Sequence, residues 1–392
     1  MSDLPLSGIR VLDLSRLLPG PLCSLMLADL GAEVLKVEDP VGGDYVRWLP
    51  PHIKNESAFF MFVNRGKKSM KLNLKAEEGR EIFKKLAKNY DVVLESFRPG
   101  VMDKLGVGYD VLKKINPGII LCAISGYGAD GPYRDKAGHD LNYISIAGLQ
   151  SVTGTRNGAA VMPGFQAADI GGGSMYAAIG ILAALQMKAK TGRGQFVDVS
   201  MMEGAMTFLT PIMSSYFAQK TPPARGREHL TGGLICYNVY NAKDGDISLG
   251  ALEPKFWQEF CRLVNRPDLV DEQMADGDNY DRVYAEVNAI FKAKTKKEWA
   301  EFFKGKDVCC EPVNRVEELE NDPQIAARQA IIELDHPTEG KYKSLRFPVR
   351  FSESGGYRKE PPPGFGEHTA EVLKSIGYGE EKIKELEGKK VI

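Results

Sequence analysis

The sequence lacks an excess of charge of either sign. Its 51 lysines and arginines nearly cancel its 52 aspartates and glutamates, so the formal net charge at pH 7 is −1. A protein without a strong positive field does not concentrate nucleic acid or an anionic membrane at its surface. We therefore expect no nucleic-acid partner, and any anionic ligand must be bound by local basic residues.

Cysteine is scarce and unpaired along the chain. The six cysteines form no CxxC motif, and they and the five histidines do not show the spacing of a metal site. We therefore expect reduced thiols and no metal.

Long apolar runs are missing as well. The longest apolar stretch, around residues 179–187, is shorter than the roughly 20 residues that cross a bilayer. The first residues place acidic and polar side chains before a short apolar strand, unlike a secretory signal. We therefore expect a cytoplasmic protein with no membrane partner.

The composition is that of a folded protein, with 43% hydrophobic and 26% charged residues in a chain of 392. This length exceeds one ordinary core and favours two domains. Helical patterns alternate with apolar strand patterns, and strands are expected at 9–14, 33–37, 92–94, 119–124 and 196–199. Such alternation predicts an α/β fold, with a parallel sheet covered by helices on both faces.

A domain boundary is expected where the periodicity breaks. Residues 221–233 are rich in proline, arginine and glycine, which is typical of a linker. We predict a large domain at 1–220 and a smaller α+β domain at 221–335, in which a turn at 241–246 joins two strands of a hairpin. The last segment, 336–392, is expected to return to the large domain.

Common motifs of enzyme sites are absent. No P-loop occurs, and no GxGxxG follows the first strand, where the loop reads SRLLPGPLCS. GxSxG, HExxH and EF-hand motifs are also missing. Standard motifs therefore indicate no more than an α/β enzyme.

Three segments nevertheless carry polar residues of possible chemical use. His139 and Asp140 stand at the expected start of a helix, Asp169 precedes three glycines at the start of a long apolar helix that ends near residue 190, and Glu253 precedes a proline and a helix. Each carboxylate has a purely structural alternative as a helix cap or dipole partner. Glycines cost about 1 kcal/mol each against alanine in a helix, so those after Asp169 indicate close approach of either a ligand or a packed neighbour.

Six segments together carry a resemblance. They are GIRVLDLSRLLPGPLCSLMLADLGAEVLKVEDP, VLESFRPGVMDKLGVGYDVL, AGHDLNYISIAG, ADIGGGSMYAAIGILAAL, TGRGQFVDVSMMEG and GALEPKF. In this order they resemble the family III coenzyme A transferase superfamily (CaiB/BaiF type), and within it the α-methylacyl-CoA racemases. The resemblance extends from about residue 6 to 375.

The resemblance implies a fold and a ligand. Members form an interlocked homodimer, in which each chain has a Rossmann-like large domain built from both chain ends and a smaller domain between them. Coenzyme A binds to the large domain as part of the thioester substrate, and no prosthetic group is implied. The residues that it points to for coenzyme A are Lys36, Leu72, Ser96, Phe97, Arg98, Lys104, Gly126 and Tyr127.

The resemblance also implies a reaction. A racemase or epimerase inverts the α-carbon of a 2-methylacyl-CoA by two-base 1,1-proton transfer, which places the chain in fatty acid metabolism. His139 and Asp169 are the expected bases on the two faces, because an imidazole titrates near neutral pH and a buried carboxyl can be brought there. Asp140 and Glu253 are expected to orient His139 and to stabilise its imidazolium.

A second reaction stays open at this point. In the transferase branch of the superfamily the aspartate at the position of Asp169 attacks the acyl-CoA and forms an acyl anhydride, through which coenzyme A passes between carboxylic acids. The GHD segment around His139 and the GALEP segment around Glu253 resemble the racemase branch.

Overall fold

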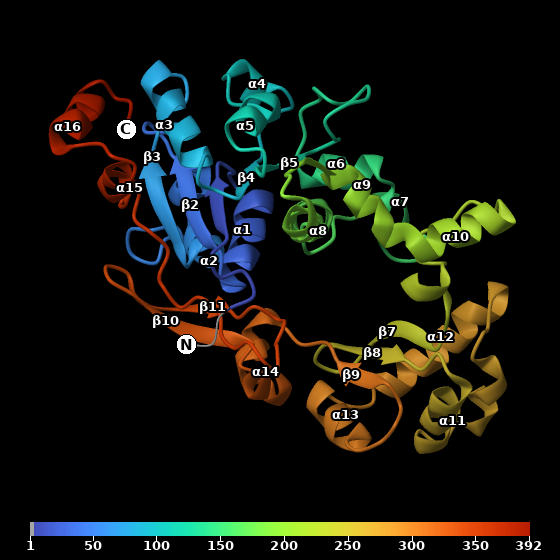
Figure 1. The fold of residues 1–392 in the computed structure, drawn as a ribbon. Helices are drawn as coiled ribbons and strands as arrows, with labels where there is room; N and C mark the ends of the chain where they lie inside the picture. The colour runs from blue at the N-terminus through green and yellow to red at the C-terminus, as the bar shows by residue number, and fades with distance from the viewer. Residues whose placement is uncertain (1–3) are drawn as a thin grey trace. The chain divides into compact units, whose positions relative to one another are not determined.

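The structure is a computed structural model that describes residues 4–392, and the chain forms two compact units (Figure 1). The first unit contains the chain up to Ala147, Phe165–Thr207 and Pro323–Ile392. The second contains Gly148–Gly164 and Phe208–Asp322. The boundaries between the two units therefore lie after residue 207 and after residue 322. The sequence predicted these boundaries after residues 220 and 335.

The physical reason for this difference lies in the segment 221–233. Its turn chemistry predicted a linker, but within the second unit it packs against the loop Gly154–Asn157, where a Cβ added at Gly226 would lie 2.3 Å from the Arg156 nitrogen. Turn-forming residues mark a change of chain direction, and here the turn is inside a packed unit. The segment 148–164, which the sequence placed in the large domain, joins the second unit for the same reason.

The first unit is built on a six-stranded sheet in which every pairing is parallel. Its order is β3-β2-β1-β4-β5-β6. The strands are β1 (Arg10–Asp13), β2 (Glu33–Glu38), β3 (Lys67–Lys71), β4 (Val92–Glu95), β5 (Ile120–Ser125) and β6 (Phe196–Ser200). The α/β prediction is confirmed. The strands that follow β1 are added on one side of it up to β3 and on the other side from β4 onward, so the strand order reverses between β1 and β4. The carboxyl ends of these two strands therefore border the crevice where ligands bind in such sheets.

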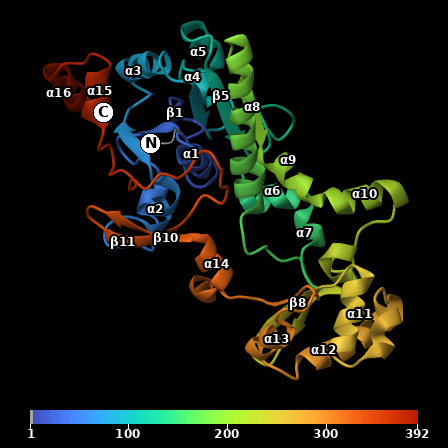
Figure 2. The same ribbon diagram turned by 60° about the horizontal axis from the view of Figure 1, so that its bottom comes forward.

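Helices follow the strands on both sides of the sheet (Figures 1 and 2). Those of the first unit are α1 (Pro19–Asp29), α2 (Ala58–Asn64), α3 (Glu77–Ala87), α4 (Val101–Lys104), α5 (Tyr109–Ile115), α6 (Asp140–Ile146), α8 (Tyr176–Thr191), α9 (Met201–Met206), α14 (Pro323–Arg328), α15 (Thr369–Ser375) and α16 (Glu380–Gly388). A hairpin of β10 (Ile331–His336) and β11 (Gly340–Leu345) completes it.

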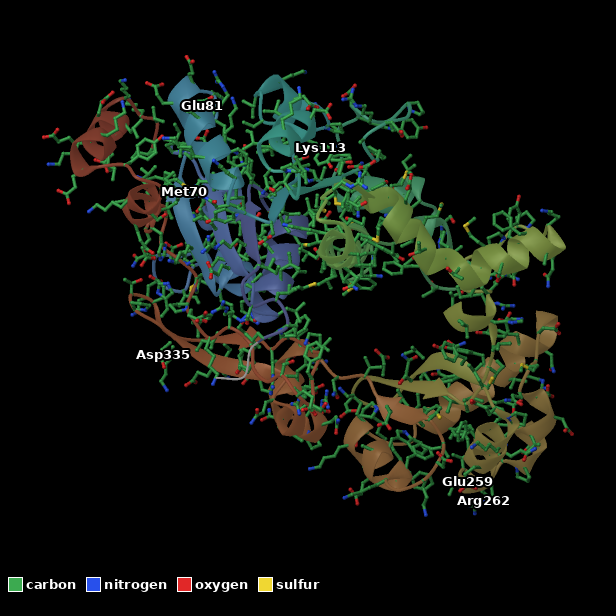
Figure 3. The ribbon with its side chains drawn as sticks, in the orientation of Figure 1. Met70, Glu81, Lys113, Glu259, Arg262 and Asp335 are labelled. Carbon is green, nitrogen blue, oxygen red and sulfur yellow. The ribbon has the colours of Figure 1, made fainter. Side chains whose placement is uncertain are left out.

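The core of the first unit joins distant parts of the chain. Leu12 of β1, Phe83 of α3 and Leu121 of β5 pack in one buried cluster with Leu373 of α15 and Leu386 of α16. Met70 of β3, labelled in Figure 3, belongs to it and is fully buried. Burial of such side chains contributes about 1.5–3 kcal/mol each, and the C-terminal helices are held to the sheet in this way.

The second unit has an aromatic core under a small antiparallel sheet. The sheet contains β7 (Tyr237–Asn241), β8 (Asp246–Gly250) and β9 (Cys310–Pro312). Its longer helices are α10 (Thr210–Gln219), α11 (Pro254–Leu263), α12 (Gly277–Phe291) and α13 (Lys296–Phe303), with α7 (Leu149–Val152) a single turn. Trp257, Phe260 and Phe291 are fully buried and stack on one another. The predicted hairpin is confirmed, since Asn241 pairs with Asp246.

The long helix expected from residue 169 starts as a different structure. Ala167–Met175 forms a π-helical segment, η2, and the regular helix α8 begins only at Tyr176. Figure 2 shows α8 alongside β5, on which it packs. Together, η2 and α8 form the stretch Ala167–Thr191, which has a mean hydropathy of 1.4. Within residues 4–392 it is the one helix that is long and apolar enough to cross a membrane, but core helices of soluble proteins have the same length and composition.

The glycines of η2 are explained by packing against α9. A Cβ at Gly172 would lie 2.3 Å from the Met201 carbonyl oxygen, and one at Gly204 would lie 2.5 Å from the Gly172 Cα. A Cβ at Gly173 would lie 3.0 Å from the Met201 side chain and 3.1 Å from that of Pro19. Of the two explanations that the sequence left open for these glycines, the structure supports close contact between backbones.

Candidate active site

One carboxylate ties together the two segments that carry the predicted bases. Asp140, in the first turn of α6, accepts hydrogen bonds through Oδ1 from the backbone N–H groups of Ala168 (2.7 Å) and Asp169 (3.0 Å). The start of α6 and the start of η2 are therefore joined directly. His139 immediately precedes this carboxylate and Asp169 carries one of the bound N–H groups, so the structure brings the two predicted bases into one region of the first unit.

His139 is the N-cap residue of α6 and is exposed. Its backbone N–H donates to Oδ1 of Asn142 (3.0 Å), which closes the first turn of the helix. The imidazole therefore stands at the mouth of a helix and is accessible to a substrate.

Two tyrosines hold the loop that leads into His139. The Tyr143 hydroxyl donates to the Gly138 carbonyl (2.5 Å), and its ring packs edge-on against Tyr127 with centroids 5.1 Å apart. Gly126 makes room for this ring, since a Cβ there would lie 2.3 Å from it. Burial, with Asp169 nearby, raises the pKa of Tyr143 to about 12, so the phenol remains a donor at neutral pH.

The carboxyl of Asp169 has a strongly shifted pKa. Burial and then the like charge of Asp140 raise the pKa of its carboxyl to about 7. A carboxyl that titrates near pH 7 can both accept and donate a proton under physiological conditions, which is the requirement for acid and base catalysis.

Asp140→Asn is expected to lower the pKa of Asp169. The amide keeps an oxygen that can accept from the two backbone N–H groups, but it removes the like charge that disfavours ionisation of Asp169. The midpoint of the pH profile of the catalysed reaction, measured between pH 5 and 9, should lie at lower pH in the variant than in the parent. The melting temperature should change little. An unchanged midpoint would show that the charge of Asp140 does not act on Asp169.

Glu253, the remaining predicted catalytic residue, belongs to the second unit. It is the exposed N-cap residue of α11, and its carbonyl accepts from Phe256 (3.0 Å). Its carboxylate makes no capping hydrogen bond. Its support of His139 stays a prediction.

Several of the residues predicted to bind coenzyme A lie at the carboxyl ends of the parallel strands. Ser96, Phe97 and Arg98 follow β4, and Gly126 and Tyr127 follow β5. Arg98 and Lys104 are exposed and can meet phosphates, whereas Tyr127 is 6% exposed.

Lys36 and Leu72 do not offer their side chains to a ligand. The Lys36 ammonium is completely buried, where it donates to the Ser15 carbonyl (2.9 Å) and pairs with Asp44 (2.8 Å). Leu72 is 2% exposed in the main core. A phosphate would have to displace Asp44 from Lys36 and would meet no polar group on Leu72, so a role of these two positions in binding coenzyme A stays a prediction that would depend on their backbone.

Arg16 is a residue that the sequence reasoning missed. It follows β1, and its backbone N–H donates to the Ser96 hydroxyl (3.2 Å), which joins the two loops at the crevice. Its guanidinium carbon lies 5.7 Å from the Phe97 ring centroid and 5.2 Å from that of Tyr45. A basic residue directly after the first strand was the available signal, since this turn approaches anionic ligands in Rossmann-like folds.

Glu95 is a second residue without a sequence prediction. It ends β4 and is 6% exposed, and its Oε2 accepts from the Phe97 N–H (2.6 Å). Burial raises the pKa of its carboxyl to about 8, with Asp103 and Asp198 adding to the effect and the Phe97 N–H opposing it. Glu95 thus shapes the loop expected to hold coenzyme A while being mostly neutral.

Residues 6–369 match the CoA-transferase family III. The chain belongs to this family. This chain is 36% identical over 391 residues to succinyl-CoA:glutarate CoA-transferase of Homo sapiens, and the match covers 97% of this chain and 88% of that protein. It is 33% identical over 389 residues to alpha-methylacyl-CoA racemase of Homo sapiens, covering 99% and 97%.

Solved structures agree with this assignment. A CaiB/BaiF family protein from Brucella suis superposes with a TM-score of 0.81 at 32% identity, over 95% of this chain and 100% of that one. Members of the family act on CoA thioesters, so the chain is an enzyme of the CoA-transferase and racemase type. Relatives named for both reactions match at similar identity. No group of three or more His, Cys, Asp or Glu side chains suited to a metal occurs in the part of the chain that the structure describes.

Proposed function

We propose that this family III enzyme is a racemase that inverts the α-carbon of 2-methylacyl-CoA thioesters. The observation that carries the proposal is the join between α6 and η2, where Asp140 holds the N–H of Asp169 beside His139. This join connects the segment that carries the exposed His139 to the segment that carries Asp169, and burial raises the pKa of the Asp169 carboxyl to about 7. Two such groups suffice to remove a proton from one face of a carbon and to return one to the other.

The reaction proceeds in two proton transfers. One base removes the α-proton next to the thioester carbonyl, and the negative charge moves to the carbonyl oxygen as an enolate. Backbone N–H groups at the start of α6 are suited to meet this oxygen. The second group, in its acid form, then protonates the carbon from the other face, and the two groups exchange roles in the reverse direction.

For coenzyme A, the residues that fit are those of the crevice between β1 and β4. Arg98 and Lys104 are exposed cations suited to phosphates. Arg16, whose guanidinium lies near the rings of Tyr45 and Phe97, adds a third cation there. The thioester is substrate, and no prosthetic group takes part in the proposed steps.

A second candidate is coenzyme A transfer, which is favoured by the names of relatives such as the human succinyl-CoA:glutarate CoA-transferase. In that reaction the Asp169 carboxylate attacks the thioester carbonyl and the coenzyme A thiolate leaves. The thiolate then attacks the Asp169 carbonyl of this anhydride, which releases the donor acid and leaves coenzyme A as a thioester on Asp169. The acceptor carboxylate displaces the thiolate to form a second anhydride, and the thiolate attacks the acceptor carbonyl, which gives the new thioester and restores the Asp169 carboxylate.

Deuterium exchange separates the two candidates. The purified enzyme is incubated with a (2R)- or (2S)-2-methylacyl-CoA in D₂O without any acceptor acid, and the thioester is examined by mass spectrometry and chiral separation. A racemase incorporates one deuterium at the α-carbon and yields both epimers. Absence of label, together with transfer of coenzyme A to added glutarate and trapping of Asp169 by hydroxylamine, would replace the racemase by the transferase.

We further propose that the enzyme is a cytoplasmic homodimer of the interlocked type. Large apolar side chains are exposed along one stretch of the first unit: Met175 (48%), Ile179 (59%), Leu182 (37%) and Met187 (49%). Exposed apolar surface of this kind is typical of a protein interface. Sedimentation at micromolar concentration should therefore give the mass of two chains, and the mass of one chain would contradict the proposal.

A further inference from the structure

The second unit contains a large cavity of its own. Its volume is about 910 Å³, and it is lined by the loop Gly154–Asn157, by the segment that includes Leu230, and by residues of β7, β8 and α12. Every residue that lines it belongs to the second unit. Cavities of roughly 300–1,000 Å³ are typical of sites for small molecules.

A single cationic side chain lines this cavity among the residues that the structure describes, that of Arg156. Its guanidinium carbon lies 3.9 Å from the ring centroid of Tyr280, and its Nε is buried without a hydrogen-bond partner. The Asp281 carboxylate forms a long ion pair with this Nε at 3.8 Å, beyond hydrogen-bond distance, and the Asp281 side chain is 78% exposed. A guanidinium has five N–H donors, and a buried donor left without an acceptor is costly.

The loop that carries Arg156 is held in place by its neighbours. Arg227 donates to Oδ1 of Asn157 (2.6 Å), and Arg225 donates to the Gly158 carbonyl (2.8 Å). Gly226, with φ +63°, packs directly against the Arg156 backbone. The guanidinium is thus positioned before any ligand binds, which reduces the entropic cost of binding.

The remaining walls define what can accompany the guanidinium. Leu230, Tyr237, Val239, Leu249 and Tyr284 offer apolar and aromatic surface. Asp246, the other acid that lines the cavity, is exposed and accepts from Asn241 (3.0 Å). The cavity therefore combines a guanidinium that lacks a hydrogen-bond acceptor at Nε with apolar walls that can contact a hydrocarbon chain.

From these observations we propose that this cavity binds a small aliphatic carboxylic acid, with the carboxylate on Arg156 and the chain against Leu230 and Val239. A carboxylate supplies two coplanar acceptors that match the fork of a guanidinium. The proposal concerns a ligand site of the second unit and does not depend on which reaction occurs at Asp169.

Calorimetric titration of the full chain tests the site. The probes are pentanoate and glutarate, which carry a carboxylate, and pentanamide, which has the same chain as pentanoate without the charge. We expect both acids to bind and pentanamide to bind at least about tenfold more weakly. Arg156→Gln should weaken the binding of the acids by at least about tenfold, and Arg156→Lys, which keeps the charge but not the fork, by less.

The matched control is Arg262→Gln on α11, where the guanidinium donates to its helix neighbour Glu259 through hydrogen bonds of 2.6 and 2.7 Å (Figure 3). This variant should bind pentanoate like the parent. Equal affinity of the parent for pentanoate and pentanamide, or unchanged binding in a folded Arg156→Gln variant, would overturn the proposal. Near-ultraviolet circular dichroism shows whether the aromatic core of the second unit is intact in each variant.

Discussion

Asp169→Asn is expected to lower the rate of deuterium incorporation at the α-carbon by about 10³-fold while the protein stays folded. The amide cannot take or give a proton, and a positioned acid or base contributes about 10²–10⁴-fold to such a step. The substitution is close in shape, and the backbone N–H of residue 169 can still donate to Asp140. The measurement is the initial rate of exchange in D₂O at saturating thioester.

The matched control is Asp130→Asn, which changes an exposed aspartate of the same unit. Its exchange rate should equal that of the parent. If Asp169→Asn kept more than about a tenth of the parent rate, the carboxyl would not be a base in the reaction.

Asp169→Asn also has a testable effect on the free energy of unfolding. Burial raises the pKa of Asp169 from its ordinary value to about 7, so between about pH 4 and pH 7 the folded protein holds a proton that the unfolded chain has lost. The free energy of unfolding of the parent therefore decreases as pH rises through this window. Asp169→Asn removes that dependence, so the variant should gain stability relative to the parent as pH rises from 4 to 8 in urea titrations.

His139→Gln is expected to abolish inversion and to leave exchange on one face. With a single base remaining, Asp169 can still remove and return the proton that it faces, so one epimer of the thioester should exchange with retention of configuration. The other epimer presents its proton to the missing imidazole and should exchange about 10³-fold more slowly than in the parent. Chiral separation after incubation in D₂O shows both effects in one experiment.

The control for this variant is His52→Gln, at an exposed histidine of the first unit. It should invert both epimers like the parent. Equal loss of exchange from both epimers in His139→Gln would contradict the assignment of one base to each face, and undiminished inversion would remove His139 from the reaction.

Much of the fold could be predicted from the sequence because its signals are local. The alternation of apolar strands with helical segments depends on residues within one turn or one strand, and it predicted the parallel sheet of the first unit. The turn at 241–246 predicted the β7–β8 hairpin for the same reason. The positions of His139 and Asp140 at a helix start were also readable, since helix ends have local chemical signals.

The domain limits and the roles of individual side chains were harder to predict. Residues 221–233 have the composition of a linker, but they pack against a loop some 70 positions earlier in the chain. Lys36 had the charge expected of a phosphate ligand, yet Ser15 and Asp44 enclose its ammonium. Composition reports what a side chain can do, and only its neighbours determine whether it is free to do so.

The sequence by itself determined the α/β class, the family and the two residues proposed as bases, because these depend on patterns carried by contiguous segments. Only the tertiary structure decided that Gly172 faces α9, that Arg16 joins β1 to β4, and that Asp169 titrates near neutral pH. The pKa of Asp169 is raised to about 7 by burial and by Asp140, a residue 29 positions away. Burial and the approach of like charges arise when distant segments pack together, and no local pattern records them.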